Sequence, residues 1–420
     1  MKKAFLILVI LIKTSIAQYD LSYYLYRGIE NAPTLKEIRN SESLNKLQSE
    51  LNYAQNSALQ VYLSANYFFA PFFNNNGKIL STNPDPKAIG YDVGVTNGGL
   101  YSAQINVEKN IFNGGLSTAL ERQIEIQQQQ LSFNSILEQK NIKKQITVQY
   151  LTAYQSLLFY QLSKDILDNI SAQLKITGAL VEKGFLKAQD YLLLKIEVQN
   201  QQISLSENLQ KYKNDLFQLN SFCGIKDTQL VFIDSVQIQM NKSKPRFDFL
   251  EKYRIDSMIT SNQQELFESK YQPQVKLFFN TGLNATEINE IQRKFGLSAG
   301  IDFQMPIFDG GQRDLTRQQV LVSINSIDNY KKFESNNIEN ELQTTISNIK
   351  LLQHNLDNIK NQLNDYNELI NISVKQVNSG NLSMIEYLTV IKNYFELKKN
   401  KIEKEITLQM EANNYNYWIE

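Results

Sequence analysis

The feature that most constrains this chain is a long proline-free stretch that occurs twice. The first copy follows an Asn-Gly-Gly turn at residues 113–115, and the second follows an Asp-Gly-Gly turn at 309–311. The copies end at Gly184 and Gly380, so both pairs of landmarks share an offset of 196 residues (311 minus 115, 380 minus 184). Self-similarity at one fixed offset indicates one structural unit that is built twice.

Each stretch is predicted to be one long helix, over residues 116–183 and 312–379. Apolar residues of the second copy recur at three- and four-residue steps, from Ile338 to Val377. That spacing is typical of a coiled coil or of a long packed helix. At 1.5 Å per residue each helix would measure roughly 100 Å. The turns before the helices permit positive φ angles and offer capping side chains; they consist of Asn113, Gly114, Gly115, Asp309, Gly310 and Gly311.

The first residues predict a secretory signal peptide, residues 1–17. Lys2 and Lys3 precede a nine-residue apolar run, and a small-residue pattern ends at Ala17. The formal net charge is zero, so the chain as a whole does not attract nucleic acid. The only cysteine, Cys223, can form no intramolecular disulfide, and we expect it to pack as a small apolar residue near a helix end.

A β-hairpin is predicted before each long helix, over residues 60–112 and 274–308. In the second hairpin one face is apolar from Leu297 through Ile307, and the other face is small or polar. In the first hairpin we expect a loop from Asn74 to about Gly99. Strands of about ten residues with one apolar and one polar face, bounded by aromatic residues, are typical of a membrane β-barrel.

Four strands cannot close a barrel alone. Open strand edges are not tolerated in lipid, because their N–H and C=O groups would lack partners. Several chains must therefore pool strands: two chains would give about eight, whose interior side chains fill, and three would give about twelve with an open lumen.

The rest of the chain completes the two repeats, 18–223 and 249–420. Each contains a shorter return helix, at 186–222 and at 382–417. Residues 224–248 carry turn signals and the β-prone piece Leu230-Val231-Phe232-Ile233. We predict that they form an equatorial insert where the short helices meet.

These landmarks resemble the TolC-like outer-membrane efflux proteins over the mature chain. The resemblance rests on Asn31-Ala32-Pro33-Thr34-Leu35, on the paired Asn/Asp-Gly-Gly turns, and on the paired Val-x-x-Gly turns at 181–190 and 377–386. It implies a mainly α fold with a long-helix α-barrel, a membrane β-hairpin pair, and a homotrimeric 12-stranded outer-membrane β-barrel with four strands per chain. It also implies a passive duct in the outer membrane of a Gram-negative bacterium, with its helical barrel in the periplasm.

In such a duct, substrates of a tripartite efflux or type I secretion system pass to the outside. The resemblance implies a periplasmic adaptor (membrane fusion) protein and an inner-membrane transporter of RND, ABC or MFS type as partners, with outer-membrane lipid around the barrel. It places acidic residues at the periplasmic aperture, where only Asp190 and Glu386 match. Both residues could equally cap helices, because Ser383 and Glu386 have capping-box spacing. The helix-tip turns are predicted to contact the adaptor or to pack locally; they include Gly184, Phe185, Leu186, Gly380 and Leu382.

The sequence shows no catalytic constellation, and no cofactor or metal is predicted. The single histidine, His354, lies in the helical seam region and is interpreted as a solvated or packed residue. The family's second acidic aperture position reads Thr389, and its latch positions read Val377 and Leu382. An exported long-helical structural protein, such as a periplasmic adaptor or a trimeric adhesin stalk, stays the alternative. The sequence identifies neither the exported substrate nor the class of the transporter.

Overall fold

The computed structural model describes residues 19–82, 87–91, 99–227, 229–241, 248–286 and 288–419, so the predicted signal peptide lies outside the described residues. The chain forms two compact units, and each gathers segments from both predicted repeats. Unit 1 comprises Met1–Glu37, Asn134–Phe249 and Phe333–Glu420, and unit 2 comprises Ile38–Phe133 and Leu250–Lys332. The division of the sequence into repeats stays a prediction.

Long helices dominate the fold, as the sequence predicted. The α-helices are α1 (Leu21–Asn31), α2 (Pro33–Asn56), α3 (Leu116–Glu182), α4 (Ala188–Phe222), α5 (Glu251–Ser269), α6 (Gln312–Asn378) and α7 (Met384–Ile419). Short 3-10 helices cover Asp248–Leu250 and Ile288–Arg293. Among the described residues, none of the helices combines the length and the apolar character that a membrane crossing requires.

Local signals set the ends of these helices. The Asp20 carboxylate accepts a hydrogen bond from the Tyr23 N–H at 2.8 Å and so caps α1. Pro33 occupies the first position of α2, where its missing N–H has no intrahelical partner in any case. Helix α1 therefore ends, and α2 begins, at the Asn-Ala-Pro motif.

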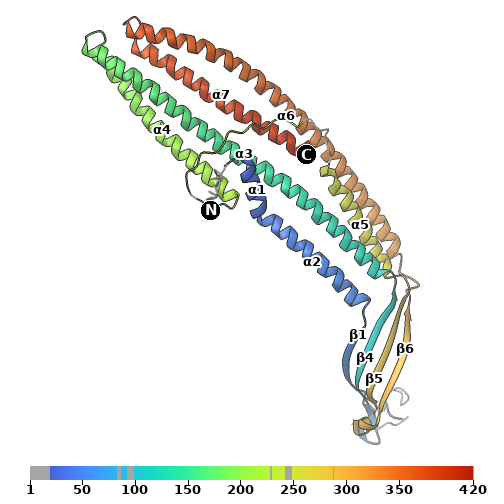
Figure 1. Ribbon diagram of the computed structural model, residues 1–420. Helices are drawn as coiled ribbons and strands as arrows, with labels where there is room; N and C mark the ends of the chain where they lie inside the picture. The colour runs from blue at the N-terminus through green and yellow to red at the C-terminus, as the bar shows by residue number, and fades with distance from the viewer. Residues whose placement is uncertain are drawn as a thin grey trace, which may run out of the picture. The chain divides into compact units, whose positions relative to one another are not determined.

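In unit 1 a cluster of buried apolar side chains joins the ends of two helical hairpins. Figure 1 shows α4 folded back along α3, and α7 folded back along α6. The cluster takes residues from all four helices: Ile166, Ile170, Leu194, Val198, Val377, Met384, Tyr387, Leu388 and Ile391. Burying an apolar side chain of this size contributes about 1.5–3 kcal/mol, so the cluster holds the two hairpins together.

The predicted equatorial insert packs on unit 1 as an extended segment. The Tyr212 hydroxyl donates to the Val231 carbonyl at 2.6 Å, and the Phe232 ring stacks on Tyr212 at 6.0 Å. Further along, the Ile238 N–H donates to Gln409 of α7 at 3.0 Å. The β-prone residues 230–233 form no strand, because tyrosine hydroxyls and helix side chains, rather than a neighbouring strand, satisfy this backbone. Cys223 is fully buried at the end of α4, as expected.

In unit 2 buried asparagines tie the helices together. Asn45 and Asn52 of α2 donate to the carbonyls of Ile124 and Ser117 at 2.9 and 3.2 Å. Asn262 of α5 donates to the Ala119 carbonyl at 3.0 Å, and it is 2% exposed. Helices α2 and α5 are thereby both fixed to the first part of α3.

Four strands of unit 2 form one antiparallel sheet in the order β1-β4-β5-β6 (Figure 1). The strands are β1 (Gln60–Phe69), β4 (Gly99–Asn113), β5 (Gln274–Ala285) and β6 (Phe295–Gln304). The two predicted hairpins are therefore joined through β4 and β5, whose register pairs Val107 with Phe279. The sequence alone did not predict this junction.

Two expectations for the hairpins were wrong in detail. Strand β6 ends at Gln304 rather than Ile307, because Pro306 has no N–H to donate to a neighbouring strand. The expected loop from Asn74 begins with a second small hairpin, β2 (Phe72–Asn75) and β3 (Lys78–Ser81). Its two-residue turn, Asn76-Gly77, has φ angles of 47° and 81°, and this dipeptide is the strongest short hairpin signal in a sequence.

Candidate functional site

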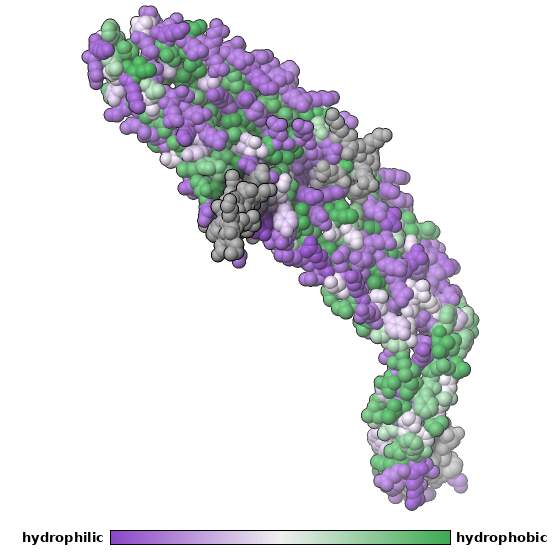
Figure 2. Space-filling view, viewed as in Figure 1, coloured by the Kyte–Doolittle hydropathy of each residue, from purple (hydrophilic) through white to green (hydrophobic). Residues whose placement is uncertain are grey.

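The register of the four-stranded sheet separates the side chains into an apolar face and a polar face. On one face Val61 lies opposite Val107, Leu63 opposite Ile105, and Tyr67 opposite Tyr101. The same face continues on the other two strands with Val275, Leu277, Phe279, Leu283, Phe295, Leu297, Ile301 and Phe303. Figure 2 shows hydrophobic residues gathered over these strands. Several of these side chains are well exposed, Leu297 at 74% and Ile301 at 68%, so the face is apolar but uncovered.

The other face of the sheet is mostly polar or small, although Phe68, Leu100 and Phe278 also lie on it. Ser64 lies opposite Gln104, Asn280 opposite Ser298, and Gly282 opposite Gly296. Three charged residues lie on this face, Glu108, Lys276 and Asp302, and all lie toward the strand ends that adjoin the helices. The alternation in the sequence assigns each of these residues to a face of its own strand, but only the pairing of the strands brings the three together.

The three charged residues form a row across β4, β5 and β6. The Tyr62 hydroxyl donates to one Glu108 oxygen at 2.6 Å, and the Lys276 ammonium donates to the other at 3.1 Å. Lys276 also lies opposite Asp302 in the register. Asp302 is exposed and has no ion-pair partner among the described residues.

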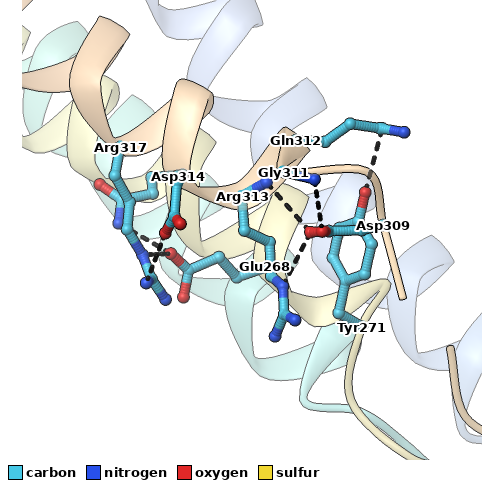
Figure 3. Close-up of polar contacts among 9 residues, drawn as sticks. Glu268, Tyr271, Asp309, Gly311, Gln312, Arg313, Asp314 and Arg317 are labelled. Carbon is cyan, nitrogen blue, oxygen red and sulfur yellow. Dashed lines mark hydrogen bonds and ion pairs between the residues drawn. The ribbon is translucent and has the colours of Figure 1, made fainter. Parts of the chain in front are cut away.

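The second strand-to-helix turn, Asp309-Gly310-Gly311, is built around one carboxylate (Figure 3). Asp309 accepts hydrogen bonds from the Gly311 N–H at 2.9 Å, and from the N–H and guanidinium of Arg313 at 3.1 and 2.9 Å. The hydrogen bond from the Arg313 N–H is the main cause that lowers the pKa of Asp309, and the Arg313 guanidinium and the Gly311 N–H lower it further. Desolvation raises this pKa by less. Asp309 therefore caps the start of α6, as predicted.

Helix α5 and Tyr271, two residues beyond its end, support the same turn. The Arg313 guanidinium lies over the Tyr271 ring at 5.1 Å, and the Tyr271 hydroxyl donates to Gln312 at 3.1 Å. One turn later, Arg317 donates to Glu268 at 2.8 Å, as Figure 3 shows. These contacts fix the direction in which α6 leaves the sheet.

The first strand-to-helix turn is held differently. Gly114 and Gly115 have φ angles of 65° and 78°, so this turn also uses the left-handed region. A Cβ on Gly114 would lie 2.5 Å from the Ser269 carbonyl of α5, so only glycine fits against that helix end. Asn113 makes no side-chain hydrogen bond with the described residues, and the capping role predicted for it is not seen.

Both helix-tip turns are Schellman motifs. At the first, the Gly184 N–H donates to Val181 and the Phe185 N–H donates to Leu180. At the second, Gly380 donates to Val377 and Asn381 to Gln376. Gly184 and Gly380 have φ angles of 78° and 73°, as this motif requires. The two turns lie next to each other, because a Cβ on Gly380 would be 4.0 Å from the Phe185 carbonyl.

Asp190 and Glu386 both cap the helices that leave these turns. Glu386 accepts from the Ser383 N–H at 3.1 Å and from its hydroxyl at 2.8 Å, while the Glu386 N–H donates back to Ser383 at 3.2 Å. The hydroxyl of Ser383, and then its N–H, lower the pKa of Glu386. Asp190 accepts a hydrogen bond from the Lys187 N–H at 3.2 Å. The reciprocal bond of a full capping box is missing here, because the lysine ammonium cannot accept the Asp190 N–H. Neither carboxylate is committed to an ion pair among the described residues.

The apolar residues of the tip turns differ in exposure. Phe185 is 69% exposed, whereas Leu186 is half-buried. Leu382, for which adaptor contact and local packing were both open, packs against the apolar cluster of unit 1. Local packing therefore accounts for Leu382 and leaves Phe185 as the apolar side chain available to a partner. His354 is exposed and lies 3.3 Å from the Asn358 amide.

Two polar contacts between the helical hairpins were not predicted. Lys392 of α7 forms an ion pair with Glu197 of α4 at 3.0 Å, and the Glu197 side chain is only 9% exposed. Gln173 of α3 donates to Asn378 of α6 at 3.0 Å. Neither pair could be found by periodicity, because each joins residues about 200 positions apart in the chain.

Comparison with solved structures defines the class of fold. The chain has the fold of the TolC-like outer-membrane channels. A membrane protein from Pseudomonas aeruginosa matches with a TM-score of 0.74 and 13% identity, over 95% of this chain and 90% of that one. The outer membrane protein VceC from Vibrio cholerae matches with a TM-score of 0.71 and 10% identity, over 95% of both chains. The CmeC outer membrane channel of Campylobacter jejuni matches with a TM-score of 0.69 and 10% identity, over 95% of this chain and 86% of that one.

The similarity is one of fold rather than of sequence. No protein-family model matches the chain, and no curated protein matches it in sequence.

Proposed function

We propose that the chain is one subunit of a trimeric channel in the outer membrane. It acts as the passive exit duct of a tripartite efflux or type I secretion system. One observation carries the proposal: a four-stranded sheet with one exposed apolar face, whose end strands β1 and β6 each pair with a single strand among the described residues. An exposed apolar face of this kind marks an interaction surface, and lipid fits strands of this length and alternation.

Closure of the sheet requires other copies of the chain. Three copies supply about twelve strands, enough for a barrel with an open lumen, and pair every free edge. The apolar face then turns to lipid and the polar face lines the lumen. The shared fold supports this arrangement, because VceC is an outer membrane protein and CmeC an outer membrane channel.

We propose partner proteins because a passive duct needs an external source of energy for transport. The inner-membrane transporter, of RND, ABC or MFS type, would supply the energy, and a periplasmic adaptor would dock on the tip turns. The exposed Phe185 ring, next to Gly184 and close to Gly380, is the apolar contact that we assign to the adaptor.

Asp190 and Glu386 are proposed to form carboxylate rings at the periplasmic aperture. Their capping role does not conflict with this, because a carboxylate that accepts local N–H groups keeps its charge. Rings of acidic side chains favour cations in a pore. We therefore expect divalent-ion block at this aperture.

Disulfide cross-linking tests the trimer. With Cys223 replaced by serine, Ser64→Cys on β1 is combined in turn with Gly296→Cys, Ser298→Cys or Gly300→Cys on β6. At least one pair should give a covalent trimer on a non-reducing gel of outer-membrane fractions, and Ser64→Cys alone should not. Monomer at every pair, together with absence from the outer membrane, would refute the proposal.

The aperture is tested in planar bilayers. Asp190→Asn with Glu386→Gln removes both charges, while each side chain keeps one oxygen that can still accept the capping N–H. Cation selectivity and divalent-ion block should both fall. If both stay at the wild-type level in a conducting trimer, the aperture assignment is wrong although the channel assignment stands.

A further inference from the structure

The polar face of the sheet carries its charge at one level only. Apart from Glu108, Lys276 and Asp302, the described residues that the register places on it are uncharged: Gln60, Tyr62, Ser64, Asn66, Phe68, Leu100, Ser102, Gln104, Asn106, Asn110, Asn113, Gln274, Phe278, Asn280, Gly282, Asn284, Gly296, Ser298, Gly300 and Gln304. The three charged residues lie on three adjacent strands. We call them the charged belt.

The belt is internally unbalanced. Both oxygens of Glu108 are engaged, one by the Tyr62 hydroxyl and one by the Lys276 ammonium, so this ion pair is neutral as a unit. The side chains of Lys276 and Glu108 are 37% and 24% exposed, so the pair still faces solvent. Asp302 lies opposite Lys276 but forms no hydrogen bond or ion pair with it, and its carboxylate is exposed. Each chain therefore contributes one uncompensated negative charge at this level.

The surroundings leave this carboxylate accessible. Glycines occupy positions 296 and 300 of the same strand, so small residues alternate with polar ones beside Asp302. A Cβ on Gly300 would lie 2.4 Å from the Phe278 ring, so Phe278, which lies on the same face, packs over Gly300. The Asp302 carboxylate stays exposed beside this contact.

We propose that the charged belt is a second ion-selecting level of the channel, distinct from the aperture at Asp190 and Glu386. The inference rests on the proposed function, which turns the polar face toward the lumen. In a trimer, three Asp302 carboxylates surround the pore and favour cations, while Lys276 keeps the Glu108 charges masked. The belt thus favours cationic or neutral cargo over anionic cargo.

Two variants of the charged belt should shift the reversal potential of the channel in opposite directions. Lys276→Gln unmasks Glu108 and doubles the negative charge of the belt, so the reversal potential in a KCl gradient should shift toward greater cation selectivity. Asp302→Asn abolishes the net charge and should shift it in the other direction. Asp302 forms no side-chain hydrogen bond or ion pair with the described residues that its replacement would break, so this variant should keep its fold.

Lys109→Gln is the matched control. Lys109 lies opposite Leu277 on the apolar face, one position from the Lys276–Asn110 pair. The Lys109→Gln variant removes the same charge at the same level as Lys276→Gln, but on the lipid side, so the reversal potential should not change. All variants are measured as trimers purified from the outer membrane and inserted into planar bilayers.

The outcomes separate this inference from the proposed function. Opposite shifts for Lys276→Gln and Asp302→Asn, with none for Lys109→Gln, support the belt. A conducting wild type whose reversal potential is unchanged in both belt variants, or is shifted equally by Lys109→Gln, overturns the belt and leaves the channel intact. A wild-type trimer that does not conduct overturns the channel itself.

Discussion

The hydroxyl of Tyr150, in the middle of α3, donates a hydrogen bond to the carbonyl oxygen of Asp234 at 2.7 Å. The same hydroxyl lies 3.2 Å from the Tyr19 carbonyl. The Tyr150 side chain is fully buried. A single phenol thus holds both the insert and the chain segment before α1 against the long helix.

Replacing Tyr150 by phenylalanine should destabilise unit 1. The ring remains, but the hydroxyl proton that the two carbonyls share is lost, and loss of such a hydrogen bond costs about 0.5–1.5 kcal/mol. Thermal unfolding followed by circular dichroism should show a lower midpoint, and proteolysis should cleave residues 225–241 more rapidly. Tyr53→Phe is the control, because Tyr53 is 62% exposed. An unchanged midpoint for Tyr150→Phe would show that these hydrogen bonds contribute nothing net.

Buried tyrosines should make the protein sensitive to alkali. Burial raises the pKa of Tyr212 to about 12, and it also raises the pKa values of Tyr24 and Tyr150 above their ordinary value. Because the unfolded chain loses these protons first, their contribution to stability is present below pH 10.0 and is lost as the pH rises toward about 12. Tyrosinate absorbance at 295 nm should therefore rise in two steps, the second with unfolding. One smooth step in folded protein would contradict this.

The Asp309 cap should make stability depend on pH on the acid side. Its lowered pKa means that its contribution is present above the unfolded value of 3.8 and is lost as the pH falls through the folded value. Asp309→Asn, which copies the residue at position 113, should lower the thermal midpoint at pH 7 and flatten its acid dependence. Asp328→Asn, at an exposed position of the same helix, should change neither.

Alanine in place of Gly184 or Gly380 should destabilise the helical hairpins, because these positions have a left-handed backbone conformation and not because a side chain would clash. Gly184 has open space around it, and a Cβ on Gly380 would meet its nearest atom at 4.0 Å, so sterics are not limiting. A left-handed φ costs a non-glycine residue about 1–2 kcal/mol. Gly184→Ala and Gly380→Ala should lower the thermal midpoint, whereas the asparagine variants should recover part of the loss. Equal midpoints for alanine and asparagine would argue against the left-handed conformation.

A lysine introduced at two neighbouring positions of β6 should affect trimer assembly differently, because the two side chains lie on opposite faces of the sheet. Leu297→Lys places an ammonium on the apolar face, where lipid exposure costs about 2–4 kcal/mol near the bilayer centre. Ser298→Lys places it on the polar face, where water is available. The first variant should reduce the amount of assembled trimer in the outer membrane, measured by heat-modifiable migration, and the second should not. Equal loss in both variants would contradict the proposed orientation of the sheet.

Periodicity predicted most of the local structure because it is a local property. Pro33, the glycine pairs and the tip glycines marked element ends, since each residue type fits a backbone geometry that few others tolerate. Where two local signals competed, the prediction failed: apolar alternation extended β6 to Ile307, but Pro306 ended the strand pairing. Residues 230–233 are β-prone, but they form no strand, since none of the described strands lies beside them.

The residues of the candidate site also fall into those whose roles are local and those whose roles depend on distant segments. The Asp309 cap, the capping carboxylates and the tip glycines could be assigned from sequence, because their roles are fulfilled within a few residues. The capping role predicted for Asn113 is not seen, and Gly114 is required by its contact with the remote Ser269. The charged belt and the Glu197–Lys392 pair could not be assigned from sequence, because each depends on which distant segments become neighbours.

The sequence by itself determined the two long helices, the turns that begin and end them, and the face on which each strand residue lies. An alternation of period two assigns a residue to a face but does not identify the strand beside it. Only the tertiary structure placed β4 beside β5 and so brought Lys276 within 3.1 Å of Glu108, a residue 168 positions away. The physical reason is that strand pairing is decided by backbone hydrogen bonds between remote segments, and the register that satisfies them sets which charges are masked and which stay free.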